Sequence, residues 1–366
     1  MSGSGMRRVL LIVLSLVLLG AALMSFFITR DGERVTPMGE GTVTIGGKTY
    51  EAFPLPDYAA SALTTDYKSY FIEVEPGIKI HVLETGSGYP VYMQHGNPTS
   101  GLLYRKVAAE LPTDRLRLIM PTMVGLGFST KVPASEHTLD NHMRWMNTAL
   151  AALELEGLVY VGQDWGGAVG MGALALSPDL LEGAVLLNTG FTPPAEKRQL
   201  SQAHALAKTP VIGELLLENL VSIFDRLHET QGDPDSLGPE VAALYGRPVL
   251  ESGNRKGPLA LMRMVPDSPD HPSTSGLHAI EDYIETLDVP AAIVWGMQDP
   301  IFARALPAMQ GYFPEAPVTR TEAGHFLQEE VPSEIAAAII SVVAQVNAEP
   351  VEAVETRRPD GIPANP

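Results

Sequence analysis

The chain has 366 residues, of which 45% are hydrophobic and 19% are charged, so it can bury the large core of one α/β domain with an insertion, or of two domains. Its formal net charge of −18 repels phosphate, which excludes nucleic acid as an expected partner and leaves small neutral substrates unaffected. Because the sequence contains no cysteine, disulfides, thiolate nucleophiles and cysteine-based zinc sites are excluded.

An uncharged apolar run of 21 residues, from Val9 to Thr29, follows the basic pair Arg7–Arg8. At about 1.5 Å per residue this run spans about 30 Å, the thickness of a bilayer core. Because it ends in SFFITRD, a poor cleavage site, residues 1–30 are predicted to be an uncleaved membrane anchor. There are two alternatives: a cleaved signal peptide, or a soluble protein whose start has been assigned too far upstream. The basic pair places the rest of the chain on the periplasmic or extracytoplasmic side, and a cleaved signal would give a secreted protein.

Beyond the anchor, residues 31–65 are rich in Gly, Pro and Thr and are interpreted as a tether and a segment that leads into the fold. Apolar runs of strand length then alternate with runs of helical spacing. Strands are expected over 67–75, 78–85, 90–96, 116–122, 158–164, 183–189, 291–299 and 316–324. Helices are expected over 101–111, 137–155 and 332–347, with Thr138 as a cap of the second.

This alternation predicts an α/β fold, with a mostly parallel eight-stranded sheet that carries helices on both faces and an antiparallel hairpin at its edge. The core is assigned to residues 66–190 and 288–347. Between them, residues 191–287 are Leu- and Ala-rich with Pro- and Gly-rich loops, and are predicted to form a helical cap. The last segment, 348–366, lacks periodicity and is predicted to be disordered.

The segment VGQDWGGAVG, residues 161–170, places Asp164 between glycines where a strand meets a helix. Such a sharp turn lifts a side chain into a site, and in most sequences of this shape the residue is a serine. Asp299 and His325 also follow predicted strands. Because the carboxyl ends of parallel strands open on one crevice, the three side chains can converge there. Helix N-caps for the two aspartates, and a core position for His325, are the alternatives.

A fourth element is MQHGNPTSG, residues 93–101, in which Asn97 follows a strand and the pair His95–Gly96. Backbone N–H groups at this place can face a developing oxyanion, although Asn-Pro also occurs in ordinary turns. Together HGNPTSG, GQDWGG, RMVPDSPDHPS, VWGMQDPIF and AGHFLQEE resemble the haloalkane dehalogenases of the α/β-hydrolase superfamily, from about residue 66 to 345.

The resemblance implies hydrolysis of a haloalkane to an alcohol and a halide ion through an alkyl ester of Asp164. A carboxylate is already ionised, so it can displace halide from an sp³ carbon without a base. His325 would then take a proton from water, and Asp299 would orient the imidazole. Some family members carry this acid as a glutamate after the strand that precedes the cap, a position that is Asn188 here.

The same resemblance assigns two roles to Asn97 and Trp165. Their backbone N–H groups would form the oxyanion hole, and the Asn97 amide with the Trp165 indole would stabilise the departing halide. No cofactor or metal is implied, water is the co-substrate, and the expected substrate is small, neutral and halogenated.

Two other functions are open. Epoxide hydrolases use the same aspartate, but their alkoxide leaving group needs an acid from two cap tyrosines. The insertion holds only Tyr245 and Tyr283, of which Tyr283 lies at its exit. A non-catalytic, membrane-tethered binding domain on a hydrolase scaffold is the other function. Haloacid dehalogenation is disfavoured because no arginine pair stands beside Asp164 to bind a substrate carboxylate.

Overall fold

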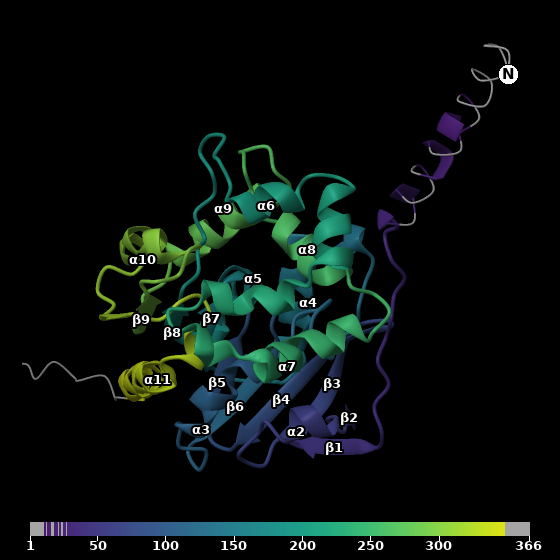
Figure 1. Ribbon diagram of the computed structural model, residues 1–366. Helices are drawn as coiled ribbons and strands as arrows, with labels where there is room; N and C mark the ends of the chain where they lie inside the picture. The colour runs from purple at the N-terminus through teal and green to yellow at the C-terminus, as the bar shows by residue number, and fades with distance from the viewer. Residues whose placement is uncertain are drawn as a thin grey trace, which may run out of the picture.

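The computed structural model of the chain describes residues 11, 13–15, 18–20, 22, 25–26 and 28–347 (Figure 1). The predicted disordered tail, 348–366, lies outside the described residues, and so does much of the predicted anchor. The residues described in the apolar run are helical up to Ile28. Over the part of the chain that the structure describes, no helix is both long and apolar enough to cross a membrane.

One mixed sheet contains the ten strands found among the described residues, in the spatial order β1-β2-β3-β4-β6-β5-β7-β8-β9-β10. The strands are β1 (Thr42–Ile45), β2 (Lys48–Ala52), β3 (Lys68–Glu75), β4 (Ile78–Gly86), β5 (Tyr89–Gln94), β6 (Leu116–Pro121), β7 (Leu158–Gln163), β8 (Leu181–Leu187), β9 (Ala291–Gly296) and β10 (Val318–Thr321). Every pairing from β6 through β5 to β10 is parallel, and β1 to β4 form the antiparallel edge. The predicted α/β class and mostly parallel sheet are confirmed.

The sheet has two more strands than the eight expected. The extra strands, β1 and β2, form a hairpin within residues 31–65, which are interpreted above as a tether and a segment that leads into the fold, with Thr42 opposite Glu51. The hairpin turns at Gly46 and Gly47, which both have positive φ, the conformation that a two-residue hairpin turn requires. β2 then pairs with β3, so this segment extends the antiparallel edge.

Helices cover both faces of the sheet, as Figure 1 shows. Outside the segment between β8 and β9 they are α2 (Asp57–Ala60), η1 (Gly101–Tyr104), α3 (Arg105–Ala109), η2 (Ala134–Glu136), α4 (Leu139–Ala152), α5 (Trp165–Ala175), η3 (Pro178–Leu180), η7 (Ala303–Ala305), α10 (Leu306–Tyr312), η8 (Leu327–Glu329) and α11 (Pro332–Val346). The predicted cap of α4 is present, because the Thr138 side chain accepts a hydrogen bond from the Asn141 N–H.

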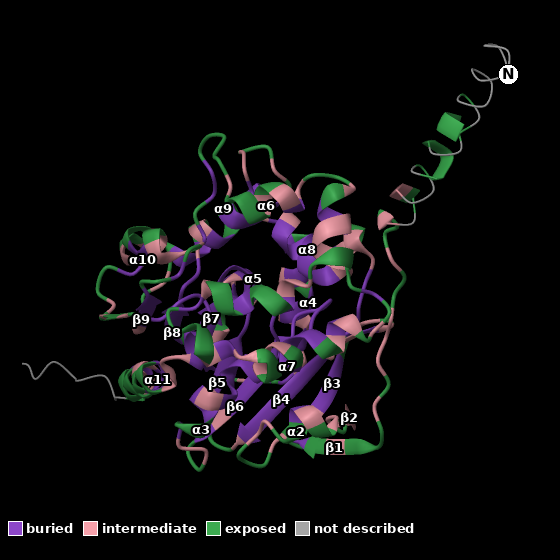
Figure 2. Cartoon of the chain, viewed as in Figure 1, coloured by how far each residue is buried: buried purple, intermediate pink, exposed green. Residues whose placement is uncertain are grey.

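Alternation along the buried strands gives the sheet two hydrophobic faces. In β7 the side chain of Tyr160 joins the cluster that includes α4 and α5, whereas Val159 and Val161 join the one that includes α3 and α11. β7 is therefore buried along its whole length, within the purple interior of the molecule in Figure 2.

Between β8 and β9 the chain forms seven helical segments among the described residues: α6 (Gln202–Ala207), the π-helix η4 (Glu214–Leu220), η5 (Ile223–Thr230), η6 (Pro234–Leu237), α7 (Pro239–Leu250), α8 (Lys256–Arg263) and α9 (Ser273–Ile284). Ala207 of α6 packs on Leu259 and Met262 of α8. α9 lies inside the segment predicted as cap, yet it packs on α4 and α5 against the sheet. The segments from α6 to α8 are therefore the part of the insertion that stands over the sheet edge (Figure 1).

Candidate active site

Asp164 occupies a strained turn between β7 and α5. Its backbone has φ 52° and ψ −131°, a region that a non-glycine residue enters only at a cost of about 1–3 kcal/mol. The surrounding structure holds this conformation, because the Asp164 N–H donates to the Asn188 carbonyl (3.1 Å) and Thr189 Oγ1 donates to the Asp164 carbonyl (2.7 Å). A Cβ on Gly166 would lie 2.2 Å from the Gln94 carbonyl oxygen, so the helix can start this close to β5 only with glycine there.

His325 and the two predicted carboxylates converge in the structure. His325 Nδ1 lies 3.0 Å from Asp299 Oδ2, and His325 Nε2 lies 3.7 Å from Asp164 Oδ2. His325 follows β10 and Asp299 follows β9, so the three residues come from strand ends that meet at one edge of the sheet. The geometry gives the imidazole one carboxylate on each ring nitrogen.

Asp299 is held firmly in its position. Its Oδ2 also accepts a hydrogen bond from Asn188 Nδ2 (2.7 Å), and its Oδ1 accepts one from the Ile301 N–H (2.7 Å). Burial raises the pKa of Asp299, but the charge of His325 and these hydrogen bonds outweigh it, so the pKa lies below its usual value. Asp299 therefore stays ionised beside the imidazole.

Burial acts in opposite directions on the pKa values of Asp164 and His325, yet both values lie above their usual range. Burial raises the pKa of Asp164 above its usual value, and the charge of His325 with the N–H groups of Trp165 and Asn97 offsets only part of that shift. Burial lowers the pKa of His325, but the carboxylates of Asp299 and Asp164 more than compensate, so its pKa lies above the usual value.

Backbone N–H groups face the carboxylate of Asp164. The Asn97 N–H donates to Asp164 Oδ1 (2.7 Å), and the backbone N–H of Trp165 also hydrogen-bonds this carboxylate. The two groups predicted to form an oxyanion hole therefore come together on the carboxylate of Asp164, while Oδ2 faces His325.

The side chains of Asn97 and Trp165 reach the site too, but each is bound to α8. Asn97 Nδ2 donates to the Pro258 carbonyl (3.1 Å), and Trp165 Nε1 donates to the Leu261 carbonyl (3.1 Å). The Asn97 Oδ1 atom is buried and has no hydrogen-bond partner. Both predicted halide donors thus converge on the same helix, α8, whose carbonyl oxygens accept one N–H from each.

Three further residues border the site that the sequence had not assigned to it. Asn188 stands where some members of the family carry the acid as a glutamate. Its side chain donates a hydrogen bond to Asp299 and also accepts one from the Gly296 N–H (2.7 Å). Phe302 stacks on the His325 ring at 5.9 Å between centroids. From α6, His204 lies within electrostatic reach of His325, and mainly burial lowers the pKa of His204 to about 4. Nothing in the sequence around His204 indicates a place near His325, because His204 belongs to a helix of the insertion and not to a loop that follows a strand.

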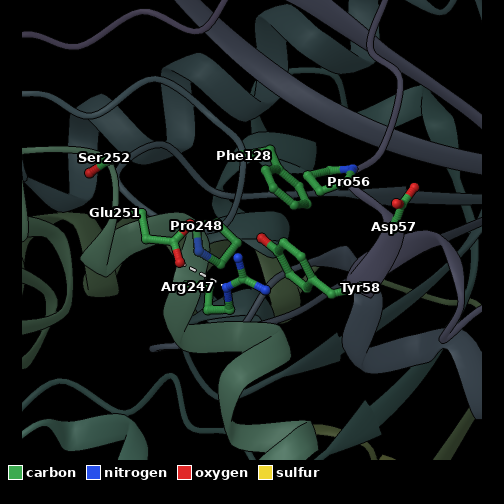
Figure 3. Close-up of a pocket in the computed structure, with 8 residues that line it drawn as sticks. All are labelled: Pro56, Asp57, Tyr58, Phe128, Arg247, Pro248, Glu251 and Ser252. Atoms are coloured by element: carbon green, nitrogen blue, oxygen red, sulfur yellow. Dashed lines mark hydrogen bonds and ion pairs between the residues drawn. The ribbon is translucent and has the colours of Figure 1, made fainter.

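Two clefts in the described residues show where a ligand could enter. The larger, of about 580 Å³, lies between α2 and α7 and is lined by Pro56, Asp57, Tyr58, Phe128, Arg247, Pro248, Glu251 and Ser252 (Figure 3). It contains none of the predicted site residues, and the Arg247 guanidinium stacks on the Tyr58 ring at 3.9 Å. The smaller crevice, of about 20 Å³, lies between η4, α7 and α8 and reaches Pro258, whose carbonyl binds Asn97.

No group of three potential metal-ligating side chains, from histidine, aspartate and glutamate, occurs within the described part of the chain. The groups that the site presents are a buried carboxylate, an imidazole and backbone N–H donors.

Known proteins share this arrangement of fold and sequence. Residues 89–332 match the family described as alpha/beta hydrolase fold. The haloalkane dehalogenase of Mycobacterium marinum is 28% identical over 291 residues, which are 75% of this chain and 93% of that protein. Haloalkane dehalogenase 2 of Mycobacterium bovis is 30% identical over 268 residues, 72% of this chain and 90% of that protein. A cis-3-alkyl-4-alkyloxetan-2-one decarboxylase of Shewanella oneidensis is 28% identical over 278 residues, 74% and 86% of the two chains.

Solved structures are similar as well. The haloalkane dehalogenase DatA from Agrobacterium tumefaciens has a TM-score of 0.65 at 26% identity, covering 78% of this chain and 99% of that one. The epoxide hydrolase CorEH has a TM-score of 0.63 at 20% identity, covering 77% and 100%, a likeness that concerns the fold alone.

Proposed function

Because the chain belongs to the α/β-hydrolase family, in its haloalkane dehalogenase branch, we propose that it hydrolyses the carbon–halogen bond of neutral haloalkanes. The observation that carries this proposal is the carboxylate of Asp164 at the elbow. One of its oxygens is bound by a backbone N–H and the other lies 3.7 Å from His325 Nε2. A carboxylate in this position forms an ester by direct displacement, a reaction that suits a leaving group needing no proton.

In the first step, Asp164 Oδ2 attacks the carbon that bears the halogen. A C–O bond forms as the carbon–halogen bond breaks, and the bonding pair leaves with the halide ion. The Asn97 amide and the Trp165 indole stabilise the growing negative charge once they are released from the carbonyls of α8. Asp164 Oδ1 stays in the oxyanion hole as the carbonyl oxygen of the ester.

In the second step, His325 Nε2 takes a proton from water, and the hydroxide oxygen attacks Cγ of the Asp164 ester. The charge that develops on Oδ1 is held by the N–H groups of Asn97 and Trp165. Collapse of this intermediate expels the alkoxide, which receives the proton from the imidazolium and leaves as the alcohol. Asp299 compensates the imidazolium charge throughout, because its hydrogen bond to Nδ1 persists.

Epoxide hydrolysis is the less favoured function because neither cap tyrosine is placed to act as the acid. The Tyr245 hydroxyl is fully buried, donates to Glu329 Oε1 and accepts from Arg105 Nη1 (3.0 Å), away from Asp164. Tyr283 lies on α9, where its hydroxyl is buried without a partner. A non-catalytic role is disfavoured because all three catalytic positions carry competent residues in contact geometry.

Replacing His325 tests the proposal, because alkylation of Asp164 needs no proton whereas hydrolysis of the ester needs a base. We expect His325→Gln, incubated with 1-bromobutane, to release about one equivalent of bromide per site and to retain a butyl adduct on the peptide containing Asp164. Mass spectrometry detects the adduct. His278→Gln, at an exposed position on α9, is the matched control and should turn over normally.

Several outcomes would contradict the proposal. Multiple turnover by His325→Gln would show that another group is the base, and wild-type halide release with no trapped adduct would remove Asp164 as nucleophile. An epoxide and a cis-3,4-dialkyl-oxetan-2-one belong in the substrate panel. Turnover of either in preference to bromo- and chloroalkanes would reassign the reaction.

For localisation, we propose that the N-terminal run anchors the chain with its catalytic part on the extracytoplasmic side. The uncharged stretch from Val9 to Thr29 and the preceding Arg7–Arg8 support this orientation. The full chain should then float with membranes after alkaline carbonate washing and be digested by protease added outside spheroplasts. Recovery of a shortened chain in the medium would instead indicate a cleaved signal and a secreted enzyme.

A further inference from the structure

Three large apolar side chains near η4 are exposed on the cap. Leu220, at the end of η4, is 66% exposed, and Val221 and Ile212 on either side of this helix are also exposed. We call Ile212, Leu220 and Val221 the cap patch. Large apolar side chains exposed to water within one short segment mark a candidate surface for a partner or a membrane.

The N-terminal part of the chain runs beside the cap patch. Lys256 Nζ donates to the Ile28 carbonyl (3.1 Å) and forms an ion pair with Glu218 of η4 (2.8 Å). Because the side chains of Lys256 and Glu218 are only 12% and 7% exposed, this junction is a packed one. A second contact follows, since Asn254 Nδ2 donates to the Glu33 carbonyl (2.7 Å).

The apolar run therefore reaches the folded part of the chain within a few residues of the cap patch. Figure 1 shows the N-terminal helix leaving the molecule next to the cap, on the side opposite α11. Among the described residues of this helix, apolar side chains such as Leu11, Leu14, Leu18 and Leu19 stand exposed. A bilayer that takes up the run would begin where the cap patch lies.

The smaller crevice lies between this same region and α8. Leu217 and Ile223, which flank Leu220 and Val221 in the sequence, line it together with Pro258 and Leu259 of α8. Pro258 is the residue whose carbonyl binds the Asn97 amide. An apolar molecule that enters between η4 and α8 thus meets the helix that covers the halide donors.

We propose that the cap patch docks on the bilayer that holds the N-terminal run, and that substrates pass from the lipid between η4 and α8 to Asp164, widening the crevice of about 20 Å³ as they enter. The substrate class is then a long-chain, water-insoluble haloalkane dissolved in the membrane, which rests on the proposed dehalogenase function. The net charge of −18 opposes attraction to anionic lipid, so docking is apolar and the bilayer that fits is a zwitterionic one.

Fluorescence labelling tests the docking without any reference to activity. The chain has no cysteine, so Leu220→Cys gives a single site for an environment-sensitive fluorophore in the full chain, reconstituted into phosphatidylcholine vesicles. We expect a blue-shifted emission that is quenched by nitroxide-bearing lipid. Ile340→Cys, an exposed position on α11, is the matched control and should be quenched only by aqueous iodide. Iodide quenching without lipid quenching at Leu220, or failure of the chain to float with the vesicles, would overturn the proposal.

Substrate preference tests the crevice. In the same vesicles, Leu220→Asp should lower the rate on membrane-dissolved 1-bromohexadecane at least about fivefold and leave the rate on water-soluble 1-bromobutane unchanged, because the charge lifts the cap from the lipid. Ile340→Asp should change neither rate. Equal loss on both substrates would place Leu220 in the folding of the cap and refute the route. If the wild type releases no halide from either substrate, the proposed function fails, while the labelling result still decides the docking.

Discussion

Replacing Gly257 by alanine is expected to tighten the binding of halide ions. Gly257 lies in the first turn of α8, and a Cβ there would sit 2.4 Å from the Gly125 carbonyl oxygen. Such a contact cannot be kept, so α8 must move away from the loop that contains Gly125. Alanine favours the helix over glycine by about 0.5–1 kcal/mol, so α8 should shift as an intact helix.

The shift would release the two donors that α8 now occupies. Asn97 Nδ2 and Trp165 Nε1 each make one hydrogen bond of 3.1 Å to an α8 carbonyl. The indole has a single N–H, so a halide that binds it has to replace its bond to Leu261, whereas the amide has a second N–H. At a net value of about 1 kcal/mol for the indole bond, removing that competition would lower the dissociation constant of a halide about fivefold.

Bromide titration of tryptophan fluorescence measures this effect. Trp145 and Trp295 are 1% and 0% exposed, so quenching by bound bromide should report on Trp165 in the site. Gly238→Ala is the control, because a Cβ there meets no atom within 4 Å. A variant that remains folded by circular dichroism yet binds bromide no more tightly than the wild type would refute the idea that α8 competes with the halide.

The remaining predictions concern the site and its attachment to the cap. Asp299→Asn removes the main group that raises the pKa of His325, so His325 should become protonated, and inactive as a base, only at a lower pH. The low-pH side of the kcat profile should therefore move to lower pH while kcat falls. An unchanged profile would exclude His325 as the titrating group. Trp165→Phe and Asn97→Ala should each lower dehalogenation at least about tenfold and weaken halide binding, and unchanged rates in both would remove them as halide donors. Tyr245→Phe removes a hydrogen bond to a buried carboxylate and should lower the free energy of unfolding by about 1–3 kcal/mol in urea titrations, with little change in kcat; a loss of activity without a loss of stability would contradict its structural role.

Much of the core could be predicted because its signals are local. The strand that precedes the turn at Asp164 was expected over 158–164 and is found over Leu158–Gln163. A short continuous apolar run next to glycine is typical of a buried strand. The same reasoning identified the candidate residues Asp299 and His325, because polar residues in the loops that follow parallel strands lie at one edge of the sheet.

The hairpin β1–β2 was not predicted because its segment was interpreted from its content of Gly, Pro and Thr as a tether and a segment that leads into the fold. Thr42–Ile45 alternates polar and apolar residues and leads into Gly46–Gly47, a pair typical of a two-residue hairpin turn, so the sequence carries a local signal for this hairpin. Its pairing with the sheet, through Glu51 opposite Phe71 of β3, was decided only by the tertiary structure.

The cap shows the same limit at the site itself. The sequence alone was enough to select Asn97 and Trp165 as candidate residues and to predict that they lie beside Asp164. Where their side-chain N–H groups point was decided by α8, which lies far along the chain from both residues. The placement of α8 depends in turn on contacts such as that of Leu259 with Ala207 and on the close approach of Gly257 to Gly125.

The division follows from the range of the forces involved. Backbone sterics and the alternation of buried side chains act over a few neighbouring residues, so the sequence by itself determined most of the strands, the sharp turn at Asp164 and the candidate site residues. Helix packing over the site joins segments that are distant in the chain and depends on the fit of whole surfaces. Only the tertiary structure could therefore decide that the side chains of Asn97 and Trp165 are bound by α8 and that the cap patch lies beside the N-terminal run.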